Sequence, residues 1–288
     1  MSNFRAYSLA VLIAGLAGAA ASFEATAADM PAVPILKTPM RSLAYDWTGF
    51  YIGVNGGGSA GRSSTDVVFT PTPPSLVGPG PFALGSVSHY MVGALGGIQA
   101  GYNWQTNAAV AGLEADIQAT GQKGGAQLPF VLPVSLNNCN APCLPQPPTP
   151  TMGAVGFAQQ LRWFGTARVR LGFTPADRWL VYTTGGLAYG EINTDATVTV
   201  AAHAETAPSF SRTKAGWVVG GGIEAALGSG WTGKVEYLHL DLGSVSGNFT
   251  ATKVFPFIGT FLATSRVTDE IMRVGVNYRF GGPVVTKY

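Results

Sequence analysis

The sequence predicts an all-β protein: an eight-stranded antiparallel transmembrane β-barrel with short periplasmic turns and long extracellular loops. The prediction follows from eight segments with period-two hydrophobicity, from connections that alternate between long and short, and from scarce charge. Only 11% of the 288 residues are charged, against roughly 25% in soluble domains, while 39 are glycine and 19 proline. This composition excludes a coiled coil and a charged disordered tail. The net charge of +2 gives no indication of nucleic-acid binding.

The first 27 residues have the pattern of a secretory signal peptide. Arg5 precedes an apolar run over residues 6–21, and Ala25-Thr26-Ala27 forms an A-x-A cleavage site. The run is shorter than the roughly 20 residues of a membrane-spanning helix, so an uncleaved anchor is disfavoured. We therefore expect export and cleavage after Ala27, followed by a flexible periplasmic lead-in over residues 28–46.

The barrel is predicted over residues 47–280, with a short C-terminal extension over 281–288. Within the barrel, apolar and polar residues alternate, which indicates strands with two different faces. The segment 179–192 is ambiguous, because both of its faces mix Thr, Gly and apolar residues. The predicted strands are 48–55, 90–104, 109–120, 158–173, 179–192, 212–227, 231–243 and 266–280.

The connections between these strands alternate in length. Residues 59–89, 121–157, 193–211 and 244–265 form the long connections, whereas 105–108, 174–178 and 228–230 form the short ones. An even number of strands with short turns on one side and long loops on the other is typical of outer-membrane barrels. The strands also reach the roughly 9–11 residues that a tilted spanning strand requires.

Aromatic residues decide between this barrel and a soluble β-sandwich or lipocalin. Many of them lie near the short turns, at one level on strands that are distant in the chain, as expected for an interfacial girdle. This arrangement predicts that the apolar face contacts lipid. The predicted girdle consists of Trp47, Trp104, Phe173, Trp179, Trp231, Tyr278 and Phe280.

The opposite face should then line the lumen, and it carries four acids and six bases. An eight-stranded barrel has an interior that side chains nearly fill, and buried charges persist when they are paired. We therefore predict a salt-bridge network that plugs the lumen; a narrow, anion-leaning pore with two uncompensated bases is the alternative. The lumen residues are Glu114, Asp116, Arg162, Arg168, Arg170, Glu224, Lys234, Glu236, Arg273 and Arg279.

The predicted loops hold the remaining candidates for a site. Cys139 and Cys143 are close together in an exported chain, which favours a small-loop disulfide over free thiols, and no further His or Cys nearby suggests a metal. Three residues could bind haem, although nothing in the sequence directs them to one pocket: His89, Tyr90 and His203. The pattern shows no catalytic constellation, so we expect neither an enzyme nor a cofactor.

The two ends of the barrel resemble a known family. The last strand, Arg273-Val-Gly275-Val-Asn-Tyr278-Arg-Phe280, is similar to the assembly signal of outer-membrane barrels: a polar residue, then Gly, then two aromatic residues. With Trp47-Thr-Gly-Phe-Tyr-Ile-Gly-Val-Asn-Gly-Gly at the start, the chain resembles, over roughly 45–280, the small porin-like, outer-membrane immunogenic barrels of alphaproteobacteria, which share the OmpA/OmpX-like architecture. Such proteins commonly stop at the final aromatic residue, whereas residues 281–288 follow here.

The resemblance implies a place in the outer membrane of a Gram-negative bacterium. It implies an envelope component and surface antigen that contributes to envelope integrity, with a diffusion channel or a haem receptor as alternatives. The implied partners are outer-membrane lipid, lipopolysaccharide and the barrel-assembly machinery, and the implied state is a monomer without nucleic acid.

Overall fold

A computed structural model describes residues 45–73, 77, 80–134, 149–200, 203–206, 210–253 and 258–281. The expected signal peptide, most of the lead-in, Cys139, Cys143 and residues 282–288 lie outside these ranges. No helix within them is long and apolar enough to cross a membrane. The strands are β1 (Gly49–Pro71), β2 (Phe82–Thr106), β3 (Ala109–Val134), β4 (Thr149–Ala176), β5 (Trp179–Val200), β6 (His203–Thr206), β7 (Phe210–Gly228), β8 (Trp231–Ala251) and β9 (Gly259–Arg279).

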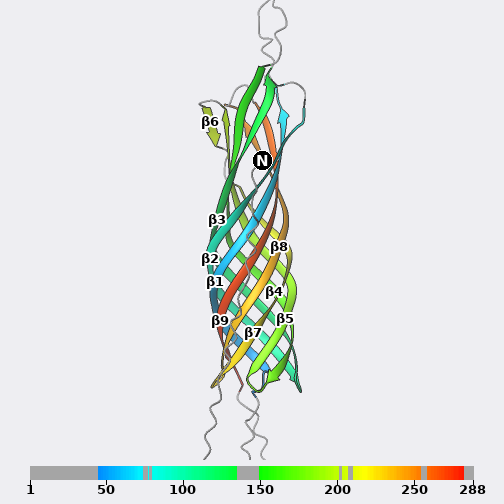
Figure 1. The fold of residues 1–288 in the computed structure, drawn as a ribbon, viewed down its shortest axis with the longest axis vertical. Coiled ribbons are helices and arrows are strands. Elements are labelled where there is room, and N and C mark those ends of the chain that lie inside the picture. The colour runs from blue at the N-terminus through cyan, green and yellow to red at the C-terminus, as the bar shows by residue number, and fades with distance from the viewer. Residues whose placement is uncertain are drawn as a thin grey trace, which may run out of the picture. The chain divides into compact units, whose positions relative to one another are not determined.

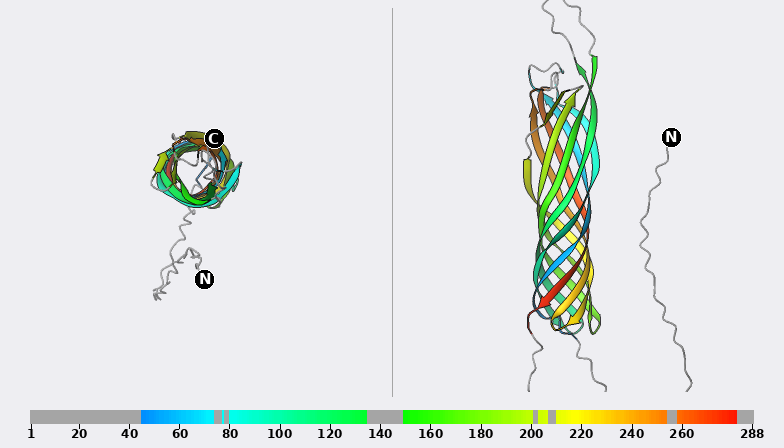
Figure 2. Two further views of the ribbon diagram at one scale, coloured as in Figure 1. Left: turned by 90° about the horizontal axis from the view of Figure 1, so that it is seen from above. Right: turned by 90° about the vertical axis from the view of Figure 1, so that its left-hand side faces the viewer.

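Eight of these strands form a closed antiparallel ring, which confirms the predicted fold class (Figures 1 and 2). The order is β4-β3-β2-β1-β9-β8-β7-β5, and β4 pairs with β5 to close it, while the short β6 pairs with the end of β5. Following paired residues around the ring from Phe50 leads back to β1 at Ala60, ten positions farther along. This stagger requires the strands to tilt, as closure of a barrel demands.

The strands are much longer than the sequence predicted. All but β7 (Phe210–Gly228) continue well into the segments expected to be long connections, so that β1 ends at Pro71 and β3 at Val134. The long strands project at the end opposite the short turns, and β3 and β4 reach farthest (Figure 1). A strand of about 10 residues already spans a membrane. The remainder of each strand therefore forms an extension of the barrel on the outer side.

The extension is not a continuous ring. Among the described residues, pairing of β2 with β3 stops at Val92 and Lys123, and pairing of β7 with β8 stops at Trp217 and Asp241. Beyond these points β8, β9, β1 and β2 form one sheet, and β3, β4, β5 and the first residues of β7 form the other, with β6 paired to the end of β5. Their inner faces share one apolar cluster, which includes Val67, Phe69, Phe249, Phe261 and Ala263 from the first sheet and Leu128, Phe130, Val155, Phe157 and Val198 from the second.

A β-bulge in β4 changes which residues face inward. Leu161 pairs with Ile192 and Trp163 with Glu191, so Arg162 is the extra residue in β4 relative to β5. An extra residue shifts the two-residue alternation by one position. Even-numbered residues such as Phe164 therefore point inward on the membrane side of the bulge, and odd-numbered residues such as Leu161 point inward beyond it.

Candidate functional site

A layer of charged side chains crosses the lumen near the short-turn end of the barrel. Successive side chains of a strand point to opposite faces, so residues two positions apart share a face. All members of the layer are on the inner face of their strands. All are almost completely buried. This charged layer consists of Glu114 and Asp116 on β3, Arg168 and Arg170 on β4, Glu224 on β7, Lys234 and Glu236 on β8, and Arg273 on β9.

Glu114 is the centre of the charged layer. Its carboxylate accepts hydrogen bonds from Arg168, from Arg170 at 3.3 Å and from Lys234 Nζ at 3.1 Å. The phenol of Tyr51 donates a further bond of 2.7 Å, and Arg273 lies 3.7 Å away. Four cations around one carboxylate offset much of the cost of removing these charges from water.

Two further carboxylates connect the layer across the lumen. Glu236 lies 3.1 Å from Arg168 and accepts a 2.7 Å bond from Arg273 Nε. Asp116 accepts bonds of 2.8 Å from Arg168 and 2.9 Å from Arg273. Each of the two arginines therefore bridges β3 and β8, strands on different sides of the ring. The network is continuous rather than a set of isolated pairs.

Arg170 is held between two aromatic rings. Its guanidinium lies 3.9 Å from the centroid of Tyr182 and 5.6 Å from that of Tyr51, and it donates a 2.6 Å bond to Glu224. Stacking on tyrosine supplements the ion pair, because the ring face attracts a cation most strongly where water is absent. Tyr182 in turn donates a 3.0 Å bond to Glu236.

Glycine on neighbouring strands makes room for these rings. A methyl group on Gly101 would lie 2.4 Å from the Tyr51 hydroxyl, and one on Gly222 would lie 2.7 Å from that of Tyr182. Both distances are shorter than van der Waals contact allows. The glycine at these two positions is thus required by the close approach of the tyrosines that flank Arg170.

The structure brings together eight of the ten residues predicted to line the lumen, and it excludes two. Arg162 is exposed on the outer face, so its predicted place in the lumen is wrong, because the bulge reverses the alternation at that residue. Arg279 lies at the end of β9, where its Nε donates to Tyr45 at 3.1 Å and contacts no carboxylate of the layer. The layer therefore contains four acids and four bases, and the two uncompensated bases expected for an anion-leaning pore are not in it.

The short-turn mouth of the barrel is covered by residues that precede β1. Trp47 is 2% exposed and packs with Val110, Leu180, Tyr182 and Ala226 inside the mouth. The amide of Tyr45 donates to Asp177 O at 2.9 Å, across the mouth in the turn between β4 and β5. The predicted place of Trp47 in the lipid-facing girdle is therefore wrong. Trp47 precedes the first strand residue, so strand alternation did not determine its direction.

Comparison with known proteins agrees with this architecture. The family model described as outer membrane protein beta-barrel domain matches residues 9–280. The chain belongs to this family. A 31 kDa outer-membrane immunogenic protein of Brucella melitensis is 33% identical over 278 residues, covering 94% of this chain and 99% of the relative. These findings confirm the resemblance seen in the sequence and a location in the outer membrane of a Gram-negative bacterium.

Two weaker matches also bear the names of outer-membrane proteins. A 22 kDa outer membrane protein of Rhizobium leguminosarum is 25% identical over 201 residues, covering 70% of this chain and 67% of the relative. Among solved structures, the outer membrane protein OprG of Pseudomonas aeruginosa aligns with 82% of this chain and 97% of its own, with a TM-score of 0.43 and 10% identity.

In this outer-membrane barrel, the other six residues of the predicted girdle are exposed on the outside of the short-turn end: Trp104, Phe173, Trp179, Trp231, Tyr278 and Phe280. Neighbouring rings contact one another, as in the pair Trp231–Tyr278, whose centroids are 5.1 Å apart. Aromatic rings at this level fit the boundary between lipid and the periplasm.

A second girdle, which the sequence analysis missed, lies at the outer boundary. It consists of Trp163, Tyr189, Trp217 and Tyr237, one each on β4, β5, β7 and β8. Polar groups accompany these rings: Trp163 Nε1 donates to Glu191 at 3.1 Å, and the phenol of Tyr237 donates to Glu270. Trp163 lies ten positions from Phe173 in β4, which matches one membrane crossing. The carboxylates that bond these rings come from neighbouring strands, so local sequence gave no signal for them.

The candidates for other sites do not converge. His89 points into the barrel and is buried, whereas the adjacent Tyr90 is 71% exposed on the outer face. His203 is part of β6, and its side chain lies outside the described set, as do Cys139 and Cys143. In the ranges that the structure describes, no group of three or more His, Cys, Asp or Glu residues is arranged to hold a metal ion.

Proposed function

We propose that the protein is a structural component and surface antigen of the outer membrane, with a lumen that is closed to ions. The charged layer carries this proposal. Its eight side chains are balanced in charge, cross-linked from β3 to β8, and almost completely buried. Trp47 adds a second barrier at the periplasmic mouth. An interior of this kind serves stability of the barrel rather than diffusion of a solute.

Planar-bilayer recording of the refolded protein tests the closed lumen. We expect no stepwise conductance from the parent barrel. The triple variant Trp47→Gly, Arg168→Ala, Glu236→Ala removes the mouth cover and one bridge of the layer, and we expect it to conduct. The matched control Asp241→Ala, Arg266→Ala removes a 2.7 Å ion pair away from the charged layer, between the exposed Arg266 and the buried Asp241, and should remain silent. Reproducible conductance steps from the parent would contradict the proposal.

The second part of the proposal is that the barrel-assembly machinery recognises the end of β9. Tyr278 and Phe280 lie on the outer face at the end of β9, where the barrel-assembly machinery can reach them. Arg273 and Gly275 of the same motif instead serve the interior, because Arg273 belongs to the charged layer and a methyl group on Gly275 would lie 3.4 Å from Lys234 Cε. We expect Phe280→Ala to lower the yield of heat-modifiable barrel in cells. Refolding of the purified variant should be unaffected, and an equal loss in both would contradict an assembly role.

A further inference from the structure

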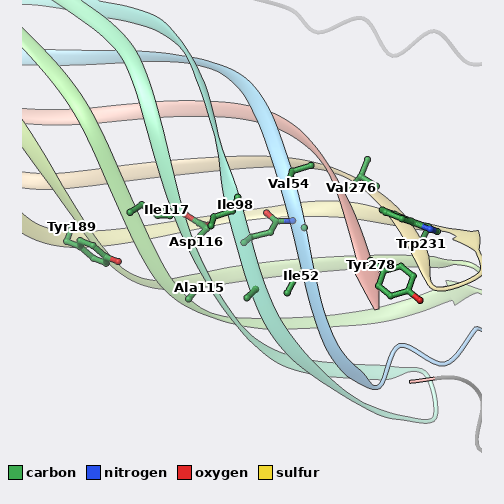
Figure 3. A pocket seen from close by; sticks show the side chains of 13 residues that line it. Ile52, Val54, Ile98, Ala115, Asp116, Ile117, Tyr189, Trp231, Val276 and Tyr278 are labelled. Atoms are coloured by element: carbon green, nitrogen blue, oxygen red, sulfur yellow. The ribbon is translucent and has the colours of Figure 1, made fainter. Parts of the chain in front are cut away.

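A hollow in the lipid-facing wall extends over several strands of the barrel (Figure 3). The hollow has a volume of about 720 Å³ and a mostly apolar lining. Ile52 and Val54 on β1, Ile98 on β2 and Ile117 on β3 line its length. Tyr189 marks its outer end, and Trp231 and Tyr278 of the short-turn girdle mark its inner end (Figure 3). Small side chains such as Ala100 and Ala115 form its floor. Its size falls in the range of sites that hold an organic ligand.

Two strands that line the hollow, β1 and β3, and the adjacent β4 carry exposed bases farther toward the outer side. Arg62 follows Val54 by eight positions in β1, and Lys123 follows Ile117 by six in β3. Arg162 lies next to the outer-girdle residue Trp163 in β4. All three are exposed on the outer face, and none makes an ion pair within the described part of the chain.

The register of the sheet places these bases at one level. Arg62 is opposite Tyr90 in β2, while Lys123 is opposite Val92, two positions closer to the membrane. Lys123 is in turn opposite Gln160, and Arg162 lies two positions closer to the membrane than Gln160. Going from β1 to β4 around the ring, each paired residue lies slightly farther from the membrane than the one before, because the strands are staggered. The two shifts toward the membrane, at Lys123 and at Arg162, compensate for this rise. The three bases thus form an arc directly above the outer edge of the lipid-facing wall.

The outer boundary is also different on this side of the barrel. Large aromatic residues mark it on β4, β5, β7 and β8, but at the same level β1, β2 and β3 carry exposed Gly58, Ala94 and Ala119. Gly58 and Ala94 face each other across the ladder. No bulky side chain therefore separates the arc of bases from the hollow. An amphiphile can reach the bases with its head group and the hollow with its acyl chains.

We propose that this wall binds the phosphorylated lipid A portion of lipopolysaccharide. The phosphates would contact Arg62, Lys123 and Arg162, and an acyl chain would lie in the hollow. Cations at the polar edge match an anionic head group in the outer leaflet, and arginine suits phosphate because its planar fork donates two parallel hydrogen bonds. The site is on the outside of the barrel, so it is independent of whether the lumen conducts.

Native mass spectrometry of the refolded barrel, titrated in detergent with bisphosphorylated lipid A, tests this site. We expect one tightly bound lipid. The variant Arg62→Gln, Lys123→Gln, Arg162→Gln should bind at least tenfold more weakly. A control with three bases replaced elsewhere, Arg178→Gln, Arg212→Gln, Lys214→Gln, should bind as the parent does. Filling the hollow by Ala100→Phe should weaken binding while leaving the bases intact.

Two further measurements separate lipid A from other occupants. Dephosphorylated lipid A and phosphatidylglycerol should each bind at least tenfold more weakly than bisphosphorylated lipid A. Equal binding of dephosphorylated lipid A, or equal loss in the arc variant and its control, would overturn the proposal. Stoichiometric dimers that exclude lipid would also overturn it, because the wall would then contact a second copy. Heat-modifiable migration on a gel confirms that every variant is folded.

Discussion

The membrane-spanning half of the barrel and its outer extension have opposite interiors. In β1, the membrane half presents Phe50, Ile52 and Val54 to lipid and points Tyr51 and Asn55 inward, whereas the extension exposes Ser64 and Asp66 and buries Val67 and Phe69. Within one strand, the apolar side chains thus change from the outer face in the membrane to the inner face in the extension, where the pattern is that of a soluble protein. The surrounding medium, rather than the strand, determines which face is apolar.

This difference means that the two halves are stabilised by different interactions. In the membrane half, lipid covers the apolar outer face, and ion pairs and hydrogen bonds of the charged layer hold the interior near the short turns. Nearer the outer boundary, a buried apolar cluster that includes Phe164, Val218 and Leu238 fills the interior. In the extension, water surrounds the outer face, and burial of aromatic and aliphatic side chains between two sheets stabilises the structure. Substitutions of equal size should therefore have different effects in the two halves.

The largest effect is expected at the centre of the charged layer. Glu114→Ala leaves Arg168, Arg170 and Lys234 buried beside a missing carboxylate, and removal of one partner of a buried pair costs about 3–5 kcal/mol. Urea unfolding of the barrel in lipid vesicles measures this loss of unfolding free energy. Glu191→Ala, on the outer face, is the matched control and should change it by less than about 1 kcal/mol. Similar losses in the two variants would refute the special role of the layer.

The extension should respond to the loss of an aromatic core residue, but only locally. Phe261 is fully buried, with ring centroids of Phe69 and Phe249 at 4.6 and 5.0 Å. Phe261→Ala should destabilise the extension by about 3–4 kcal/mol through lost burial and a cavity. Limited proteolysis of the protein in vesicles should then cleave the extension and leave a protected membrane fragment. Simultaneous loss of the fragment would show that the halves unfold together.

Introducing a lysine on the outer face should destabilise the membrane half but not the extension. Ile98 is 61% exposed to lipid near the middle of the wall, so Ile98→Lys should cost about 2–4 kcal/mol. Asn248 is exposed on the outer face of β8 in the extension, and Asn248→Lys should change stability by less than about 0.5 kcal/mol. Urea unfolding in vesicles compares them. Equal values would mean that the membrane boundary lies elsewhere.

The same inversion explains what the sequence could predict. Eight strands, their order and the inward face near the short turns follow from period two, which is clear where one face is in lipid. Between Gly56 and Gly61 of β1 the pattern fades, because small residues occupy both faces while the apolar side changes. The predicted strand therefore ends there, although the structure continues to Pro71. Arg162 was misplaced for another reason: a bulge depends on pairing with β3 and β5, which local alternation does not contain.

A small effect is expected for an ion pair on the outer face of the barrel, which can be compared with an ion pair inside the barrel. Arg266 lies 2.7 Å from Asp241, and its side chain is 65% exposed while that of Asp241 is 4% exposed. Arg273 lies 2.9 Å from Asp116, and both side chains are fully buried. Arg266→Gln should cost less than about 1 kcal/mol, because solvent screens the exposed guanidinium. The cost should also disappear at 1 M salt, where the screening length is about 3 Å.

Arg273→Gln should instead cost about 3–5 kcal/mol at any salt concentration, because it leaves Asp116 and Glu236 buried with one cation fewer. Urea unfolding of both variants at low and high salt measures the four values. A salt-dependent loss for Arg273→Gln would mean that ions reach the charged layer. The same experiment therefore measures both the energetic difference between the two environments and the closure of the lumen.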